Sequence, residues 1–437
     1  MSNFSRRGFL AAGTAALSLG AMGRVLAQDA SDNTIRIGTV FPSKTGSEFI
    51  RASTNDFIGD GGRMGAVLAD SQLGELAETN GLHLKLLNAT SPTVAAAIRA
   101  GERLVETGNI CALVGGVGEG QAHALAQIAE RARIPFFNVG ETDDALRGVG
   151  CSRYVFHVEA SDAMYLDALA ELARAQGYAR WYVVADTTAR GEALQERAAL
   201  AAEKSGSTIV GSSSVRAAQA IYYTDVDKAK AAEADVIVIL LQAYDQFNFI
   251  LQMEEAGIEK PVLTLPETIT QTRDYIAAAR YRLPKLNPRH RIALWETTTP
   301  DAAGQAFNAM IRAQWGEGAD PTAWSSYHAI KIILETVTAT GTTDAEAMIA
   351  HLENPDTAFD VLKGNGVSFR PWDHQLRQPL YGLSVDQDAA WDRMNLDSRI
   401  GIAKYEGTIP GALPADADAR NWLDQLGNSA SHSTCKL

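Results

Sequence analysis

Positive charge is scarce in this sequence of 437 residues. Lysine and arginine together number 39, against 52 aspartate and glutamate residues, so the formal net charge is −13. A phosphate backbone needs a basic footprint on its protein partner, and this charge balance does not supply one. The composition therefore argues against nucleic acid as a partner. It favours a soluble protein that also stays apart from anionic membranes.

Motifs that carry catalytic chemistry are absent too. The sequence has no G-x-S-x-G turn, no H-E-x-x-H pair and no G-x-x-x-x-G-K loop, and none of its eight histidines stands three or four residues from another. The glycine-rich run at 115–120 misses the G-x-G-x-x-G register, because Gln121 stands where the last glycine belongs. That run is either an anion or dipole site or a tight turn without a ligand. No motif in the sequence indicates a nucleophile next to a general base, so we expect no enzymatic activity.

Beyond residue 27 the sequence has no second long apolar run. Residues 1–27 combine the pair Arg6-Arg7, a stretch of small apolar residues and a small-residue cleavage site ending at Ala27. The paired arginines resemble a twin-arginine export signal, which a receptor reads and which does not anchor the protein. No cysteine stands at the cleavage point to carry a lipid. We therefore expect cleavage near Ala27 and a mature protein that is free in the periplasm.

Cysteine is rare, with Cys111, Cys151 and Cys435 as the three instances. In an oxidising compartment three cysteines allow one disulfide and one remaining thiol. Cys111 lies in an apolar run and is expected to be a small buried residue. Because Cys151 and Cys435 both lie in polar, loop-like contexts, a disulfide between them that pins the tail is our preferred pairing. We predict no metal site, since His432 and Cys435 are too few ligands for one.

Strand-like and helix-like segments alternate through most of the chain. Apolar or β-rich runs predict strands at 34–40, 82–87, 111–114, 134–137, 154–156, 181–184, 235–241 and 261–265. Helical spacing of apolar residues predicts helices at 94–105, 121–131, 163–175, 192–204, 302–313 and 327–340. Such alternation implies parallel sheets with right-handed crossovers. We expect an α/β fold with two doubly wound parallel-sheet lobes and a ligand cleft at the carboxyl ends of their strands.

The order of these features resembles the type I periplasmic solute-binding proteins, the branched-chain amino acid–binding family of ABC importers. The matching motifs cover almost all of residues 34–400 and include Ile35-x-Ile37-Gly38, Gly65-Ala66-x-Leu68-Ala69, Leu113-Val114-Gly115-Gly116 and Ile134-Pro135-Phe136-Phe137-Asn138. Two more specific motifs begin at Ser161-x-Ala163-Met164 and at Phe369-Arg370-Pro371-Trp372. They resemble a branch of the family that is associated with quinoprotein alcohol-oxidation systems.

This resemblance implies the type I periplasmic-binding-protein fold, in which two lobes joined by a hinge close on one small molecule. The N-terminal lobe would comprise residues 34–157 plus about 296–375, and the C-terminal lobe and tail residues 158–295 plus about 376–437. The implied partners are a small organic solute and the permease subunits of an ABC transporter in the inner membrane. We expect a monomer that carries no cofactor.

Family members hold their ligand with loops that follow strands, and this implies the candidate ligand-binding residues here. They are Glu119, Gly120, Gln121, Glu141, Thr142, Arg190, Gln242, Tyr244 and Glu267. A carboxylate such as Glu267 suits a substrate ammonium. Tyr244 offers an apolar ring with a hydroxyl group that can form a hydrogen bond. Arg190 could hold a carboxylate through two hydrogen bonds.

The sequence departs from the amino acid–binding members at Glu119 and Glu141, where those proteins have small or hydroxyl residues. Two added carboxylates would repel a substrate carboxylate. A cationic, amide-like or polyol ligand, or one bound with a metal ion, therefore fits better than leucine. An aromatic acid or a redox cofactor such as a quinone stays open, because Arg63 and Lys44 could face the cleft. A receptor that senses ligand for a signalling system, or an enzyme that borrows the fold, are the alternative functions.

Overall fold

The computed structural model describes residues 33–42, 55–389 and 396–437. The predicted export signal at 1–27 and Lys44 lie outside these ranges. From Thr34 onward the chain belongs to one compact unit. In the described ranges, no helix combines the length and the apolar character that crossing a membrane requires.

The first sheet is parallel, with the strand order β2-β1-β3-β4-β5. Its strands are β1 (Thr34–Phe41), β2 (His83–Thr90), β3 (Ala112–Gly115), β4 (Phe136–Asn138) and β5 (Val155–His157). The intervening helices are α1 (Asn55–Thr79), α2 (Val94–Gly108) and α3 (Gln121–Ala132). Both faces of the short central strands are covered, and every residue of β3 and β4 is buried. This explains why their sequences are continuous apolar runs without alternation.

The second sheet is also parallel, with the order β7-β6-β8-β9. Its strands are β6 (Arg180–Asp186), β7 (Thr208–Val215), β8 (Val236–Leu240) and β9 (Val262–Thr264). The helices of this part are α4 (Asp162–Ala175), α5 (Ala189–Ser205), α6 (Tyr223–Ala231), α7 (Ala243–Glu255) and α8 (Arg273–Arg282). The predicted α/β fold with two doubly wound parallel sheets is confirmed.

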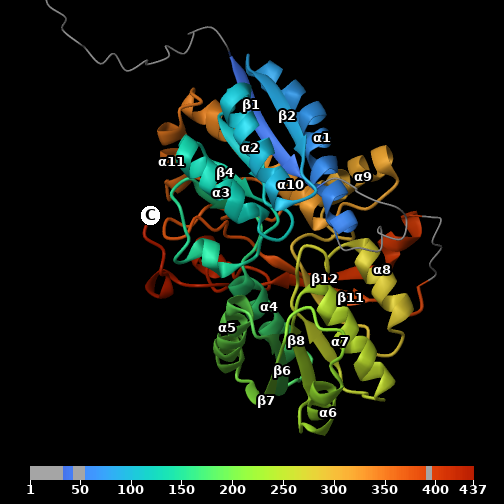
Figure 1. Ribbon diagram of the computed structural model, residues 1–437. Helices are drawn as coiled ribbons and strands as arrows, with labels where there is room; N and C mark the ends of the chain where they lie inside the picture. The colour runs from blue at the N-terminus through green and yellow to red at the C-terminus, as the bar shows by residue number, and fades with distance from the viewer. Residues whose placement is uncertain (1–32, 43–54, 390–395) are drawn as a thin grey trace, which may run out of the picture. The chain divides into compact units, whose positions relative to one another are not determined.

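A third, antiparallel sheet follows the order β10-β11-β12 and was not predicted. Its strands are β10 (His290–Ala293), β11 (Leu380–Val385) and β12 (Ala403–Ile409). The remaining elements are α9 (Ala302–Trp315), α10 (Pro321–Thr340), α11 (Ala345–Glu353), α12 (Ala419–Leu423) and the 3-10 turns η2 (Asp144–Arg147), η3 (Leu396–Ile402) and η4 (Ala430–His432). Strands β11 and β12 lie between the elements of the two parallel sheets (Figure 1).

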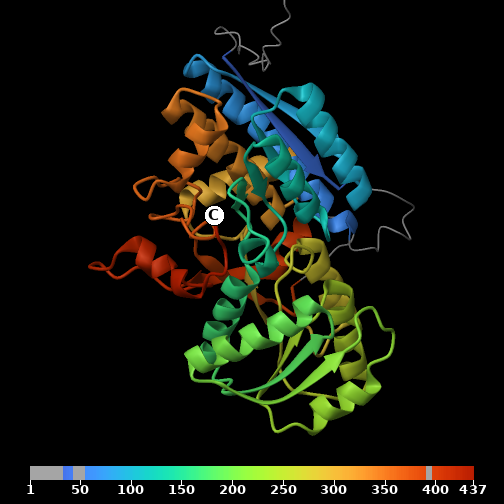
Figure 2. The same ribbon diagram turned by 60° about the vertical axis from the view of Figure 1, so that its left-hand side comes forward.

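Helices α9, α10 and α11 return to the first sheet although they follow the second sheet in the sequence. Both views show these orange elements beside the blue and cyan ones (Figures 1 and 2). The α1–α10 contact is close, because Ser326 Oγ donates a hydrogen bond to the Gly62 carbonyl at 2.8 Å. At Gly65 an added Cβ would lie 2.2 Å from the Ala323 carbonyl oxygen. Glycine is therefore required there for the two backbones to approach each other.

Three connecting segments pass between the elements of the two parallel sheets, at about 158–161, 294–301 and 376–379. They are tied together by glutamine side chains. Gln375 Nε2 donates to the Glu159 carbonyl at 2.9 Å, and Gln378 Nε2 donates to the Val158 carbonyl at 2.7 Å. Gln271 Oε1 accepts from the Leu294 backbone N–H at 2.6 Å. Gln271 Nε2 in turn donates to Tyr165 Oη at 2.9 Å, and Tyr165 Oη donates to Glu159 Oε1 at 2.6 Å, so the three segments belong to one hydrogen-bonded group.

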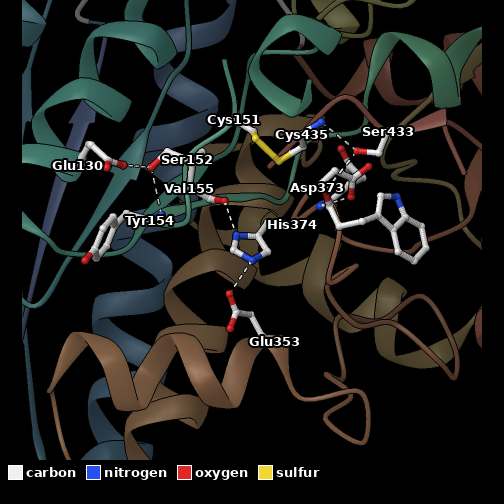
Figure 3. Close-up of a disulfide and its surroundings, with 12 residues drawn as sticks. Glu130, Cys151, Ser152, Tyr154, Val155, Glu353, Asp373, His374, Ser433 and Cys435 are labelled. Carbon is white, nitrogen blue, oxygen red and sulfur yellow. Dashed lines mark hydrogen bonds and ion pairs between the residues drawn. A yellow bond between two sulfur atoms is a disulfide. The ribbon is translucent and has the colours of Figure 1, made fainter. Parts of the chain in front are cut away.

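A disulfide joins Cys151 to Cys435, the pairing that we preferred from the sequence (Figure 3). Upstream of it, the tail contacts α4 and α5. The Gly427 backbone N–H donates to Asp167 Oδ2 at 2.9 Å, and Lys204 Nζ donates to the Gln425 carbonyl at 2.5 Å. The tail therefore runs from helices of the second sheet to the loop that precedes β5 of the first.

Cys111 lies next to the first sheet, and His157 lies within it. Cys111 lies just before β3 and is only partly buried, so the expectation of a buried residue inside the strand was too strong. His157 is 1% exposed, and its Nδ1 lies 3.1 Å from Asn138 Nδ2. Burial and the charge of Arg147 lower the pKa of His157 well below its usual value. His157 is therefore a buried, neutral structural histidine.

Candidate functional site

Loops from both parallel sheets enclose a cavity of about 320 Å³. They follow the carboxyl ends of β3 and β4 in the first sheet and of β6, β7, β8 and β9 in the second. This is where open α/β sheets place ligands. Seven of the nine candidate residues line the cavity, namely Glu119, Glu141, Thr142, Arg190, Gln242, Tyr244 and Glu267.

Gly120 and Gln121 do not line the cavity. Gly120 is the residue before α3 and has a φ of 73°, a left-handed conformation that favours glycine. The Gln121 side chain is buried, and its Oε1 accepts a hydrogen bond from Ser91 Oγ at 2.9 Å. This end of the glycine-rich loop therefore serves the strand-to-helix turn, and only Gly118 and Glu119 reach the cavity.

Arg190, in the first turn of α5, is the basic residue among the described residues of the lining. Its Nε and Nη2 donate to the two carboxylate oxygens of Asp162 at 3.0 and 2.9 Å, and Nη2 also donates to Thr142 Oγ1 at 2.6 Å. Its Nη1 lies 3.6 Å from Glu267 Oε1 and 3.9 Å from Glu141 Oε1. Although burial opposes the charged form, these carboxylates raise the pKa of Arg190 well above its usual value. Arg190 is thus engaged by the protein's own carboxylates.

Glu267 follows β9 and is 7% exposed. Its Oε2 accepts a hydrogen bond from the Ala243 backbone N–H at 2.9 Å. Burial raises the pKa of Glu267 to about 8, and the neighbouring charges of Asp162 and Glu141 add to this while Arg190 opposes it. The carboxyl group is therefore poised to gain or lose a proton near neutral pH.

Glu141 follows β4 and faces Arg190 from the first sheet. Its Oε1 accepts hydrogen bonds from the backbone N–H groups of Thr142 at 2.9 Å and Asp143 at 3.1 Å. Burial raises its pKa, against the effect of Arg190. Glu119, by contrast, is exposed at the margin of the cavity.

Besides the Arg190 contacts, further hydrogen bonds join elements of the two sheets at the cavity. Thr268, which follows β9, donates from its Oγ1 to the Gly140 carbonyl after β4. Thr142 after β4 donates to Asp162 Oδ1 at 2.7 Å, and Asp162 is the first residue of α4. Sequence reasoning missed Thr268 and Asp162. Asp162 had a signal, because an acid that follows the N-cap Ser161 begins a helix at the same strand ends.

The aromatic and amide candidates lie at the open side. Tyr244 is 65% exposed and stands in the first turn of α7, directly after Gln242 and Ala243.

Arg63, which we considered as a cleft residue, is exposed on α1 and does not line the cavity. Across residues 33–42, 55–389 and 396–437, no group of three or more His, Cys, Asp or Glu side chains is placed to hold a metal ion.

A larger hollow of about 710 Å³ lies between α4, α5 and the tail. Its buried acid, Asp167, is already paired with Arg197 at 2.6 Å and Lys204 at 3.1 Å. The rest of its lining is mainly small or apolar side chains and backbone. We regard the smaller cavity as the candidate site because its polar groups converge from both parallel sheets.

Comparisons with known proteins agree with this arrangement. A family model described as periplasmic binding protein matches residues 88–390. The structure of a periplasmic binding protein from Burkholderia mallei has a TM-score of 0.72 and 18% identity, over 92% of this chain and 98% of that one. A comparison with curated protein sequences finds no match.

Two further structures have transporter descriptions. An amino acid ABC transporter substrate-binding protein from Pseudomonas fluorescens Pf-5 has a TM-score of 0.70 and 20% identity, over 92% of this chain and 99% of that one. A solute binding protein of an ABC transporter from Rhodopseudomonas palustris BisB5, in complex with 3,4-dihydroxybenzoic acid, has a TM-score of 0.65 and 18% identity, over 81% and 94% of the respective chains. At these identities the likeness shows a shared fold.

Proposed function

Because this chain belongs to the periplasmic binding protein family, we propose that it is the substrate-binding component of an ABC transporter. It captures a small organic solute in the cavity described above and delivers it to the membrane permease. The observation that carries this proposal is the convergence of loops from two parallel sheets on one cavity. Structural neighbours whose descriptions name them as ABC transporter substrate-binding proteins support it.

Capture works by closure of two lobes about the three connecting segments. We assign residues 34–157 plus about 296–375 to one lobe and residues 158–295 plus about 376–437 to the other. Thr268 to Gly140 and Arg190 to Thr142 are hydrogen bonds between lobes on this assignment. A ligand that touches both lobes stabilises the closed state by its differential affinity for that state.

The protein acts in the periplasm as a monomer, after a twin-arginine signal at 1–27 is cleaved near Ala27. It binds its solute without turning it over, and it needs no cofactor. Within the family, the motifs at 161–170 and 369–379 relate it to the branch that is associated with quinoprotein alcohol-oxidation systems.

The test is native mass spectrometry of the mature protein purified from periplasm, followed by denaturation and identification of the released molecule. We expect one small molecule bound per chain, and the same compound should raise the melting temperature of the empty protein. Recovery of a chemically converted product from the added compound would contradict the proposal. So would an empty protein whose melting temperature no amino acid, amine, polyol, aromatic acid or quinone changes.

A further inference from the structure

Among the residues that the structure describes, four acidic residues and one basic residue line the cavity of the proposed function. The acids are Glu119, Glu141, Asp245 and Glu267, and the base is Arg190. A fifth carboxylate, Asp162, lies directly behind Arg190 and holds it through two hydrogen bonds. The site therefore has an excess of negative charge that the described side chains around it do not balance.

Arg190 is the lining residue that a ligand carboxylate would need, and its Nε and Nη2 donors already have hydrogen-bond partners. Nε and Nη2 bond to Asp162 and Thr142, and Nη1 faces Glu267 and Glu141. A ligand carboxylate could reach this guanidinium at Nη1, or at Nε and Nη2 by displacing Asp162. At Nη1 it would then stand beside Glu141, and an ionised Glu141 is a like-charge contact in a site that screens poorly.

Glu267 has spare hydrogen-bonding capacity in the cavity. It is 7% exposed, and one of its oxygens accepts from the Ala243 backbone N–H. In the described part of the chain no group donates a hydrogen bond to its other oxygen, Oε1, and Arg190 Nη1 stands 3.6 Å from that atom. An oxygen of a lining carboxylate that accepts no hydrogen bond is available to the N–H donor of a ligand.

We infer that the cleft selects a small organic cation without a carboxylate, an amine or a guanidine, whose N–H groups bond to Glu267 and Glu141. The inference rests on the proposed function and names the class of solute. The ring of Tyr244, 65% exposed at the cavity, offers an apolar surface to the body of such a molecule. The structural neighbour with 3,4-dihydroxybenzoic acid holds a ligand of opposite charge.

Binding of a cation should be coupled to proton release. The groups that face Glu267 are Arg190 from α5, Asp162 from α4, Glu141 after β4 and Tyr275 from α8. Burial raises the pKa of Glu267 to about 8 and that of Tyr275 to about 12, so at pH 7 the empty site holds Glu267 largely protonated. A bound ammonium favours the carboxylate, so its affinity should rise as pH increases from about 6 to 8.

Four pairs of compounds that differ only by an α-carboxylate test the inference. They are isoamylamine and leucine, tyramine and tyrosine, agmatine and arginine, and cadaverine and lysine. Isothermal titration at pH 7, in phosphate and in Tris, measures both the affinity and the protons released. We expect at least one amine to bind at least about tenfold more tightly than its amino acid, with release of a proton.

Two variants test whether Glu267 is responsible for amine binding and for the release of a proton. Glu267→Gln should weaken the binding of that amine by about tenfold or more and abolish proton release, because a neutral amide keeps the shape and loses the charge. Glu255→Gln, a matched change at an exposed position on α7, should leave both unchanged. Melting temperatures of both variants check that each is folded.

The outcomes separate the inference from the function on which it rests. Tighter binding of the amino acids, or binding of 3,4-dihydroxybenzoate in place of the amines, would overturn the inference and leave a solute-binding protein. Equal loss of amine affinity in Glu255→Gln would overturn the assignment to Glu267. No binding by any of these compounds would count against both the inference and the proposed function.

Discussion

At the scale of single residues, the chemistry of the cavity depends on which carboxylates hold Arg190. The sequence could indicate Glu141, Arg190 and Glu267 individually, since each follows a strand. It could not indicate that Arg190 would bond to Asp162 and Thr142, because those bonds link residues 28 and 48 positions apart. The same limit applies to Gln121, whose partner Ser91 lies 30 positions away. A residue's place after a strand is readable from sequence, whereas the direction of its side chain is not.

Glu267 should make the stability of the empty protein fall as pH rises. Its pKa is about 8 in the fold and about 4.3 in an unfolded chain, so between these values the unfolded state binds fewer protons. Stability is therefore lost as pH increases through this window. Glu267→Gln should flatten the dependence and raise stability at pH 8 by about 1–3 kcal/mol. Melting curves from pH 4.5 to 8.5 measure this, and parallel curves for variant and parent would refute it.

At the scale of secondary-structure elements, the sequence predicted the buried parallel strands well. The strands β1, β3, β6 and β8 are apolar or β-rich runs, and each was expected within one or two residues of its observed bounds. Strand β7 was missed because it is an edge strand with alternating exposure and the polar stretch Ser212 to Ser214. The antiparallel pairing of β10 with β11 was missed because the two strands are far apart in the sequence.

The α1–α10 contact offers a test within one helix. Gly65→Ala should destabilise the protein by about 1–3 kcal/mol, because the new methyl group would meet the Ala323 carbonyl oxygen. Gly74→Ala, in the same helix with nothing within 4 Å of its added Cβ, should instead stabilise it by about 0.5–1 kcal/mol. Urea unfolding of the two variants measures the difference. If both changes shifted stability in the same direction, the close approach of α1 and α10 would not be what requires Gly65.

At the scale of the whole molecule, the family was indicated by the resemblance of motifs and not by the periodicity of apolar residues. Alternating strands and helices predicted two parallel sheets, and the motifs then indicated the type I periplasmic solute-binding family, which is confirmed. The lobe boundaries, the branch within the family and the ligand contacts stay predictions. They depend on closure and on a bound molecule, and neither leaves a periodic pattern in the sequence.

The disulfide should stabilise the fold as a whole, since it links residues 284 positions apart. Cys435→Ser should lower stability by about 2–5 kcal/mol, because the unfolded chain regains the freedom of that loop. A reducing agent should lower the melting temperature of the parent protein and not that of Cys435→Ser. Cys111→Ala serves as the matched control, because Cys111 is a free thiol and its loss should leave this redox sensitivity intact. Unchanged melting of the parent on reduction would contradict the prediction.

The position of this bridge also dictates an order of assembly during biosynthesis. Cys435 is translated 284 residues after Cys151, when the strands of all three sheets have already left or are leaving the ribosome. Any folding that begins during synthesis therefore proceeds with Cys151 not yet paired to Cys435. Folding steps that are complete before Cys435 is synthesised cannot depend on the bridge.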